Sequence, residues 1–175
     1  MPGDNPDELF DRVDADDHVI GTVRRGDAHG NPALIHRSVQ VLVLDAHGRV
    51  LLQRRSDAKD LYPGYYCASA SGHVMAGETY EATARRELAE ELGVVLRLRH
   101  IGKTTVRSAA ESEVTAVYVA RSDGPFHFHP TETDGGAFYA RAVIARARAD
   151  GSLSMTSALL AALDVLDDVV PVEAR

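Results

Sequence analysis

Three glutamates near the middle of the chain are spaced to fall on one face of a helix, and this pattern constrains the fold more than any other feature. Residues 80–92 are expected to be helical, and each helical residue turns the side chain by about 100°. Glu87, Glu90 and Glu91 therefore share one arc, while Leu88 and Leu92 lie on the arc of a core-facing stripe. Carboxylates at this spacing repel one another, and a divalent cation would offset the repulsion. The face is interpreted either as a metal site of oxygen ligands, which favour Mg²⁺, Mn²⁺ or Ca²⁺, or as a solvated acidic surface.

The residues around the three acids favour the metal site. Counted from Gly72, the chain has Glu78 after five residues and Arg86-Glu87 after seven more, then an aliphatic residue, two adjacent glutamates, a glycine and a valine. A chance match to seven fixed identities in a chain of this length is rarer than roughly one in a million. Residues 72–94 closely resemble the signature of the Nudix hydrolase family, which is called the Nudix box.

The resemblance implies a fold, a cofactor and a role for each acid. The fold class is α/β, a Nudix-type α/β/α sandwich with a mixed β-sheet, in a single domain spanning residues 1–175. The cofactor is Mg²⁺ or Mn²⁺. Glu87, Glu90 and Glu91 would ligate the metal, and Glu78 would orient Arg86, to which it is suited as a bidentate partner. The general base stays open among four residues: Glu87, Glu90, Glu111 and Glu113.

Strands and helices alternate along the chain. Gly72 and Gly77 are expected to permit a tight loop before the helix, and Gly93 to end the helix in the left-handed conformation. The clearest hairpin has two aliphatic runs on either side of a turn that ends in Gly48. The expected strands cover residues 8–13 and 19–23, as an N-terminal hairpin, and 39–44, 49–53, 65–71, 97–106, 114–121 and 136–139, with helices over 80–92, 143–149 and 156–166 and loose termini over about 1–7 and 169–175.

Segments outside the box resemble one branch of the family. Over about residues 8–121, including Gln53-Arg54-Arg55-Ser56 and Tyr62-Pro63-Gly64, the chain is similar to type I isopentenyl-diphosphate isomerase. That enzyme builds a second metal site from three histidines and two glutamates, and the matching positions here are His29, His36, His73, Glu111 and Glu113. Taken alone, each histidine is more often a surface or hydrogen-bonded residue. Since alternate residues of a strand share a face, the two glutamates are expected to point the same way. A second metal or substrate site is expected at these five residues.

The chain departs from the isomerase at the position that carries its chemistry. The isomerase uses a cysteine immediately before the Gly-His pair, and this chain has Ser71 there. A hydroxyl is too weak an acid or base at neutral pH to do the same work. Cys67 would lie about 13 Å away on one continuous strand, which excludes it as a substitute. Isomerase activity is therefore not the favoured function.

Basic and aromatic residues supply candidates for substrate contacts. Arg54, Arg55, Lys59 and Arg107 are candidates for binding phosphate, although solvent-facing charge is an equal alternative. Five aromatic residues could stack on a base, although aromatic side chains are more often core: Phe10, Tyr62, Tyr65, Tyr66 and Phe138. His127 and His129 are interpreted as exposed loop residues.

Composition and charge narrow the partners. The net charge of −7 and the lack of clustered Lys and Arg argue against nucleic-acid binding. The sequence contains no run of eighteen apolar residues, so a membrane span is not predicted. The single cysteine fits a reducing, cytoplasmic location. The partner is expected to be a small-molecule diphosphate, and the sequence does not distinguish a monomer from a homodimer.

The predicted function is the metal-dependent hydrolysis of a diphosphate linkage in a nucleoside diphosphate derivative or a similar organic diphosphate. The alternatives are an isomerase-like activity and a non-catalytic nucleotide-binding module. The presence of all four box acids weighs against a pure binding module, and the sequence does not identify the physiological substrate.

Overall fold

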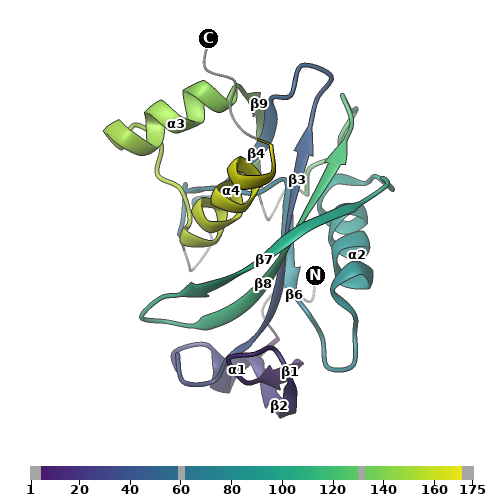
Figure 1. The fold of residues 1–175 in the computed structure, drawn as a ribbon, viewed down its shortest axis with the longest axis vertical. Coiled ribbons are helices and arrows are strands. Elements are labelled where there is room, and N and C mark those ends of the chain that lie inside the picture. The colour runs from purple at the N-terminus through teal and green to yellow at the C-terminus, as the bar shows by residue number, and fades with distance from the viewer. Residues whose placement is uncertain (1–4, 59–61, 130–132, 171–175) are drawn as a thin grey trace.

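A mixed β-sheet lies between helices in the computed structural model, which describes residues 5–58, 62–129 and 133–170. Helix α2 covers one face of the sheet, and α3 and α4 cover the other (Figure 1). This arrangement confirms the expected α/β/α sandwich with an N-terminal hairpin. No helix among the described residues is long and apolar enough to cross a membrane.

Most elements lie where the sequence predicts them. One short helix, α1, was not anticipated, and α3, α4 and β9 are longer than expected. The helices are α1 (Arg25–Ala28), α2 (Tyr80–Leu92), α3 (Arg141–Asp150) and α4 (Ser157–Val169). The strands are β1 (Leu9–Val13), β2 (Val19–Arg24), β3 (His36–Leu44), β4 (Val50–Arg55), β5 (Tyr66–Cys67), β6 (Ala70–His73), β7 (Arg99–Arg107), β8 (Ser112–Arg121) and β9 (Thr133–Tyr139).

Strand β3 is the centre of the sheet. It pairs along its whole length with β8 in parallel orientation and over residues 38–41 with β6 in antiparallel orientation. The hairpin turn after it leads into β4. Because side chains alternate along a strand, β3 contributes to both cores. Val39, Val41 and Val43 pack with α2, whereas Leu42 and Leu44 pack with α3 and α4. The strand is almost fully buried, which requires the unbroken aliphatic run that the sequence shows.

The strand expected over residues 65–71 is divided, and this prediction was wrong. Its first part, β5, pairs with β4, and its second part, β6, pairs with β3. Between them, the Ser69 hydroxyl donates to Leu51 O (2.6 Å) and accepts from Val43 N (2.7 Å). The side chain thus takes over ladder hydrogen bonds where the chain changes partner. The separation of about 13 Å between Cys67 and Ser71 assumed one straight strand and does not hold.

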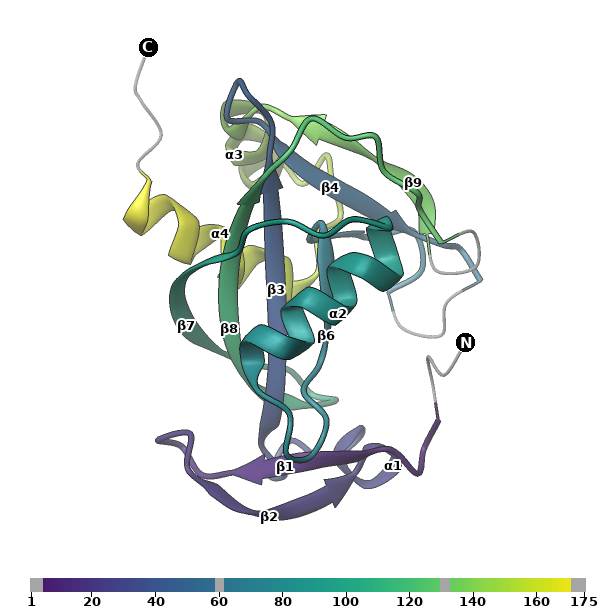
Figure 2. The ribbon, with the colours of Figure 1, turned by 90° about the vertical axis from the view of Figure 1, so that its right-hand side faces the viewer.

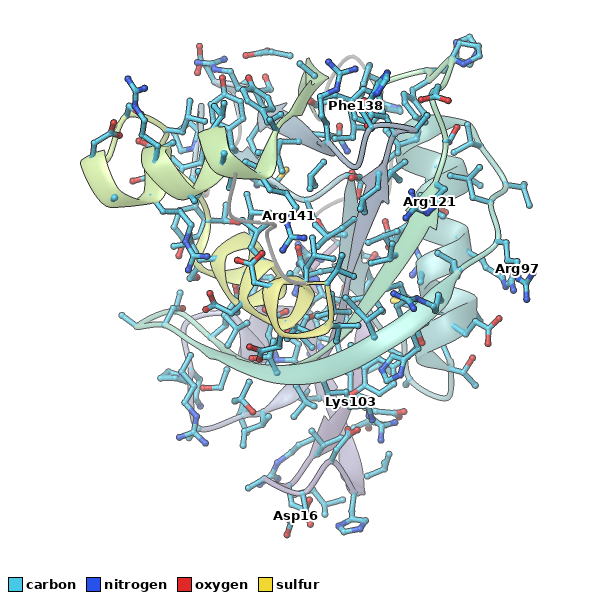
Figure 3. All side chains as sticks on the ribbon, turned by 45° about the horizontal axis from the view of Figure 1, so that its top comes forward. Asp16, Arg97, Lys103, Arg121, Phe138 and Arg141 are labelled. Atoms are coloured by element: carbon cyan, nitrogen blue, oxygen red, sulfur yellow. The ribbon has the colours of Figure 1, made fainter. Side chains whose placement is uncertain are left out.

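The N-terminal hairpin crosses the end of the sheet (Figure 2) and is anchored there by Asp17. The Asp17 carboxylate accepts hydrogen bonds from Arg37 Nε of β3 (2.7 Å), from the Tyr80 hydroxyl of α2 (2.9 Å) and from Lys103 of β7. Figure 3 shows Lys103 above the hairpin tip, which Asp16 marks. Three elements of the sandwich therefore meet at one side chain of the hairpin.

The hydrogen bonds of Asp17 are expected to stabilise the folded protein at neutral pH but not in acid. Burial opposes ionisation of Asp17, but the hydrogen bonds from Lys103, Arg37 and Tyr80 outweigh it and lower the pKa. A lowered folded-state pKa stabilises the protein above the unfolded-state pKa of about 3.9, and this contribution is lost as the pH falls through the folded-state value. Asp17→Asn is expected to lower the free energy of unfolding by about 1–2 kcal/mol at pH 7.

Urea unfolding of wild type and variant at pH 7 and at pH 2.5 measures this effect. The difference between the two proteins should narrow as the pH falls from 7 to 2.5, because the wild-type carboxylate takes up a proton as the pH passes through its lowered pKa. Asp16→Asn is a matched control, since this neighbouring residue is exposed. A gap of the same size at both pH values would contradict the electrostatic explanation.

Candidate functional site

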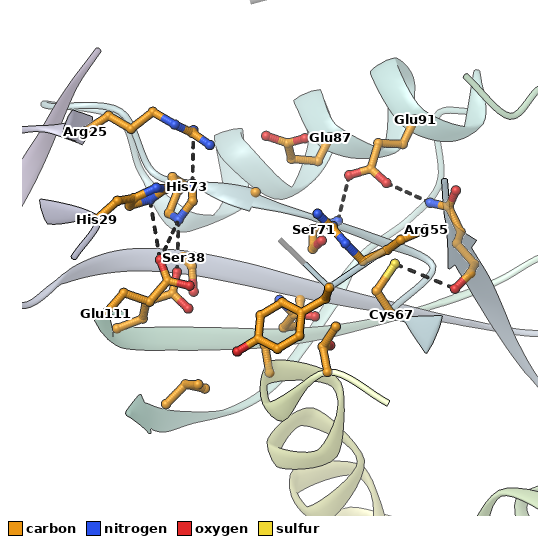
Figure 4. Close-up of a pocket in the computed structure, with 18 of the residues that line it drawn as sticks. Arg25, His29, Ser38, Arg55, Cys67, Ser71, His73, Glu87, Glu91 and Glu111 are labelled. Atoms are coloured by element: carbon orange, nitrogen blue, oxygen red, sulfur yellow. Dashed lines mark hydrogen bonds and ion pairs between the residues drawn. The ribbon is translucent and has the colours of Figure 1, made fainter. Parts of the chain in front are cut away.

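A cavity of about 720 Å³ opens where the acidic end of α2 meets the sheet and the N-terminal hairpin. In Figure 4, Glu87 and Glu91 reach into it from α2, His29, His73 and Glu111 lie at one end, and Ser71, Arg55 and Cys67 lie at the other. Most of the residues selected from the sequence thus face one space. Glu78 and His36 lie behind the cavity wall, where they contact residues that line it.

Helix α2 begins and ends as the sequence predicts. Thr79 caps its first turn by accepting a hydrogen bond from Ala82 N, and Gly93 ends it in the left-handed conformation with φ of 66°. Leu88 and Leu92 are buried in the core beneath the helix. This packing turns the opposite face, with its acids, toward the cavity.

Glu91 is fixed by donors on both of its carboxylate oxygens. Gln53 Nε2 donates to Oε2 (2.7 Å), and the backbone N–H of Ser71 donates to Oε1 (3.0 Å). Gln53 is fully buried and also donates to Ser69 O (2.7 Å), so its amide has little freedom. Sequence reasoning missed Gln53, because only the pairing of β4 with β5 brings it beside α2.

Glu87 is the most buried of the three acids. Burial raises its pKa to about 7 against the opposing effect of Arg86, whose Nη1 lies 2.6 Å from Glu87 Oε1. The carboxylate rests directly on Gly72 of β6, where an added Cβ would lie 1.9 Å from Oε1. The expected reason for Gly72, freedom in a tight loop, is therefore wrong, because close approach of Glu87 requires it. Gly77, with φ of 79°, does need the freedom of glycine.

Arg86 pairs with Glu78, as predicted, and ties α2 to the sheet. Its Nη2 donates to Glu78 Oε2 (3.2 Å) and to the backbone carbonyl of His73 (3.3 Å), and its Nη1 also approaches Glu90 Oε2 (3.4 Å). Burial opposes ionisation of Glu78, but hydrogen bonds from Arg86 and Thr83 lower its pKa. Arg86 thus stays charged and holds three carboxylates and one strand edge together.

The three histidines and two glutamates of the expected second cluster lie together. Ligand atoms of His29, His36, His73 and Glu111 are all within 4.8 Å of one another. His73 Nε2 lies 3.2 Å from Glu113 Oε1, and His29 Nε2 lies 3.4 Å from Glu111 Oε2. These residues come from the chain after α1, from β3, from β6, from the β7–β8 turn and from the start of β8. This placement matches the sequence expectation, while the role of the cluster stays a prediction.

The three histidines of the cluster differ in protonation. Burial opposes protonation of His73, but its hydrogen bonds with Glu111 and Glu113 raise its pKa to about 9. Burial and the neighbouring His73 lower the pKa of His29 to about 4, and burial also lowers the pKa of His36. The Nδ1 of His36 lies 3.3 Å from the carbonyl of Leu34, which leaves its Nε2 as an acceptor. Within the part of the chain that the structure describes, Nε2 of His29 and of His36 are buried without a hydrogen-bond donor. These two unpartnered nitrogens would be satisfied by a cation, which would replace the proton that His73 holds in its absence.

Of the three expected phosphate contacts that the structure describes, Arg55 alone lines the cavity. Arg55 faces it, whereas Arg54 forms ion pairs with Asp57 (2.9 Å) and Asp134 outside it. Arg107 is exposed and is also absent from the lining, and Lys59 lies outside the described residues. Arg54 and Arg107 therefore do not have the placement expected of phosphate contacts. Arg25 does line the cavity, beside Glu8 and His73, and was missed because α1 was not predicted.

The remaining candidates divide between cavity and core. Tyr62 lines the cavity, while Phe10 is fully buried and stacks on His36 and His73 with ring centroids 5.2 and 4.8 Å apart. Tyr66 and Phe138 belong to the two cores, and Tyr65 does not line the cavity. His127 is exposed as expected, but His129 is half-buried and lines the cavity, so its interpretation as an exposed loop residue was wrong.

Comparison with known proteins gives concordant matches. The NUDIX domain model matches residues 34–154. An isopentenyl-diphosphate Delta-isomerase of Nocardia farcinica is 36% identical over 126 residues, which cover 69% of this chain and 72% of the relative. A prenyl-diphosphate phosphatase of Methanosarcina mazei is 40% identical over 95 residues, 54% of this chain and 55% of the relative. A crystal structure from Deinococcus radiodurans superposes with a TM-score of 0.77 and 28% identity, covering 91% of this chain and 98% of that one.

Proposed function

The chain belongs to the Nudix hydrolase family, and from that premise we propose that it cleaves the diphosphate linkage of an organic diphosphate, such as a nucleoside diphosphate derivative, with the help of divalent metal. Nudix hydrolases act on small-molecule diphosphates. The observation that carries the proposal is the convergence of the α2 acids and the His/Glu cluster on one cavity. A diphosphate needs positive charge on both sides of the bond that breaks, and two cation sites across one cavity would provide it.

The residues present fit divalent cations. Ligands about 2.0–2.3 Å from an ion are at most about 4.6 Å apart, close to the 4.8 Å limit within which the ligand atoms of His29, His36, His73 and Glu111 lie. The unpartnered nitrogens of His29 and His36 supply lone pairs for such an ion. Imidazole ligands suit a transition ion such as Mn²⁺, whereas the oxygen ligands Glu87, Glu90 and Glu91 suit Mg²⁺ or Mn²⁺.

The protein side of the reaction follows from this arrangement. Bound cations would offset the charge of the diphosphate and lower the pKa of an attacking water. Gln53 and the Ser71 N–H hold Glu91 in one orientation, and Arg86 holds Glu87. Before a cation binds, burial raises the pKa of Glu87 to about 7; a bound cation would lower this pKa, so that Glu87 would hold the ion as a carboxylate. Arg25 and Arg55 line opposite parts of the cavity and would contact phosphate oxygens.

A five-carbon diphosphate isomerase is the second candidate, favoured by one observation. Cys67 lines the same cavity as Ser71, because the chain changes strands between them. However, burial raises the pKa of the Cys67 thiol to about 12, so the thiol is neutral and is not a base. The Sγ atom also lies 3.7 Å from Gln53 O, to which it donates. These features support hydrolysis over isomerisation.

Chelation should switch the proposed activity off reversibly. Protein treated with EDTA is expected to release no phosphate or mononucleotide from a panel of nucleoside diphosphate derivatives and prenyl diphosphates. Adding Mg²⁺ or Mn²⁺ should restore release, because the diphosphate charge is then offset. Calorimetric titration of Mn²⁺ into the chelated protein should show more than one bound ion, since two ligand sets face the cavity.

Four results would count against the proposal. Cleavage that persists in EDTA would show that the reaction does not need a metal. No cleavage of any compound in the panel at neutral and alkaline pH would exclude the proposed hydrolase activity. Interconversion of isopentenyl and dimethylallyl diphosphate without phosphate release, lost in Cys67→Ala, would establish the isomerase instead. Ligand binding without turnover would indicate a binding module.

A further inference from the structure

Ser38 and Thr115 form a pair of hydroxyl groups at the wall of the cavity. Their oxygen atoms lie 2.8 Å apart, at paired positions of the parallel strands β3 and β8. Thr115 is fully buried, whereas Ser38 keeps 3% of its surface exposed and lines the cavity beside His73 and Glu111 (Figure 4). Within the described part of the chain, neither hydroxyl has another hydrogen-bond partner. The pair therefore has two protons to donate and one hydrogen bond between its members.

The surroundings of the pair set the direction of this hydrogen bond. A buried hydroxyl proton without an acceptor is unfavourable. If Ser38 donated, the Thr115 proton would stay in the core, where it has no other partner among the described residues. If Thr115 donates, its proton is satisfied, and the proton left over belongs to the residue that lines the cavity. Ser38 is therefore the acceptor from Thr115 and a donor toward the cavity.

The strand register places this donor within the group of residues that would hold a cation. His73 of β6 lies directly opposite Ser38, and His36 precedes Ser38 on the same face of β3 because alternate residues of a strand share a face. Both histidines belong to the His/Glu cluster. Glu111 and Glu113 line the same part of the cavity, yet neither accepts the Ser38 proton. A phosphate drawn to a cation in the cluster would bring its oxygens next to a proton that has no acceptor.

We propose that Ser38 is a substrate-binding residue that donates a hydrogen bond to an oxygen of the diphosphate. This inference rests on the proposed diphosphate chemistry of the cavity. Attraction to a cation does not depend on direction, whereas a hydrogen bond does, so the hydroxyl would select which phosphate oxygen faces the cluster. A neutral donor is also suited to this place, because the carboxylates of Glu111 and Glu113 repel a phosphate. Hydrogen bonds to charged oxygens are stronger than those between neutral groups.

Binding of methylenediphosphonate, a diphosphate analogue whose bridge is not hydrolysed, tests the inference without turnover. Its dissociation constant is measured by calorimetry in saturating Mn²⁺. Ser38→Ala is expected to raise this constant by about ten- to a hundredfold, because a hydrogen bond to a charged oxygen is lost. The dissociation constant of Mn²⁺ alone should stay within about twofold, since no residue of the cluster is altered. Ser157→Ala is the matched control, because it removes an exposed serine hydroxyl from another part of the same cavity and should leave both constants unchanged.

A double variant separates binding from structure. Ser38→Ala alone leaves the buried Thr115 hydroxyl without a partner and should lower the melting temperature. Ser38→Ala/Thr115→Val removes both hydroxyls, so the melting temperature should recover while binding of the analogue stays weak.

Four results would overturn the inference. They are a wild type that does not bind the analogue, a Ser38→Ala constant within about twofold of wild type, affinity that recovers in the double variant, and a parallel loss of Mn²⁺ binding. The last two would assign Ser38 a structural role or a role in the cation cluster. Failure of the hydrolase proposal would instead appear as absent phosphate release by wild type, which is measured separately.

Discussion

Glu91→Gln is expected to lower kcat by on the order of a thousandfold, the largest effect of any single substitution in this protein. The carboxamide loses the negative charge that a cation needs. It also replaces one acceptor by a donor, although both oxygens of Glu91 now face donors, Gln53 Nε2 and the Ser71 N–H. One of these contacts must therefore become a donor facing a donor. The variant should fail in two ways at once, by weaker metal binding and by a displaced side chain.

Steady-state kinetics with Mg²⁺ and calorimetric titration of Mn²⁺ check this expectation. Glu81→Gln is the control, because Glu81 lies on the same helix, is exposed and is hydrogen-bonded to Arg85. The control should keep full activity and full metal binding. A Glu91→Gln enzyme within tenfold of wild type would show that Glu91 is not a required ligand.

Gly72→Ala is expected to lower kcat by roughly a hundredfold, although it adds only a methyl group. An added Cβ would lie 1.9 Å from Glu87 Oε1 and 2.2 Å from Cδ, so the carboxylate must move by more than an ångström. Displacements of this size at a catalytic group typically reduce rates about a hundredfold. The backbone at Gly72 does not have a positive φ, so conformational strain is not the cause. The loss should therefore appear in kcat more than in thermal stability.

Gly77→Ala separates the two explanations. Gly77 lies in the loop of the same segment with φ of 79°, and an added Cβ there meets no atom within 4 Å. This variant should lose about 1 kcal/mol of stability through backbone strain and keep its kcat. If Gly72→Ala and Gly77→Ala change kcat equally, the contact of Gly72 with Glu87 is not what limits the reaction.

The parts of the structure that could be predicted are those set by local chemistry. Helix α2 begins and ends where expected because Thr79 caps one end and Gly93 closes the other within a turn of the helix. The division of residues 65–71 into two strands could not be predicted, because it depends on which distant strand each half meets. Alternating apolar residues predict which face of a strand is buried, but they do not predict which other strand it pairs with.

The same limit applies to the site. The histidines and acids could be selected by their resemblance to a family pattern, whereas Ser38, Gln53 and Arg25 carry no motif. Ser38 and Gln53 became visible only through the sheet register, and Arg25 through a four-residue helix that propensity does not indicate. Conversely, Arg54 is of a residue type that often binds phosphate, but it forms ion pairs with Asp57 and Asp134 outside the cavity.

The two-sided packing of β3 also bears on how this enzyme could be redesigned or could diverge. Substitutions at Ser38 or Gln40 would change the lining of the cavity, while Val39, Val41 and Val43 support the helix that carries the acids. Residues that line the cavity and residues that support α2 thus alternate along one strand, on opposite sides of the sheet. Because neighbouring positions share one stretch of backbone, changes on the two sides should not combine additively, so a redesign of the cavity has to be tested together with the packing beneath α2.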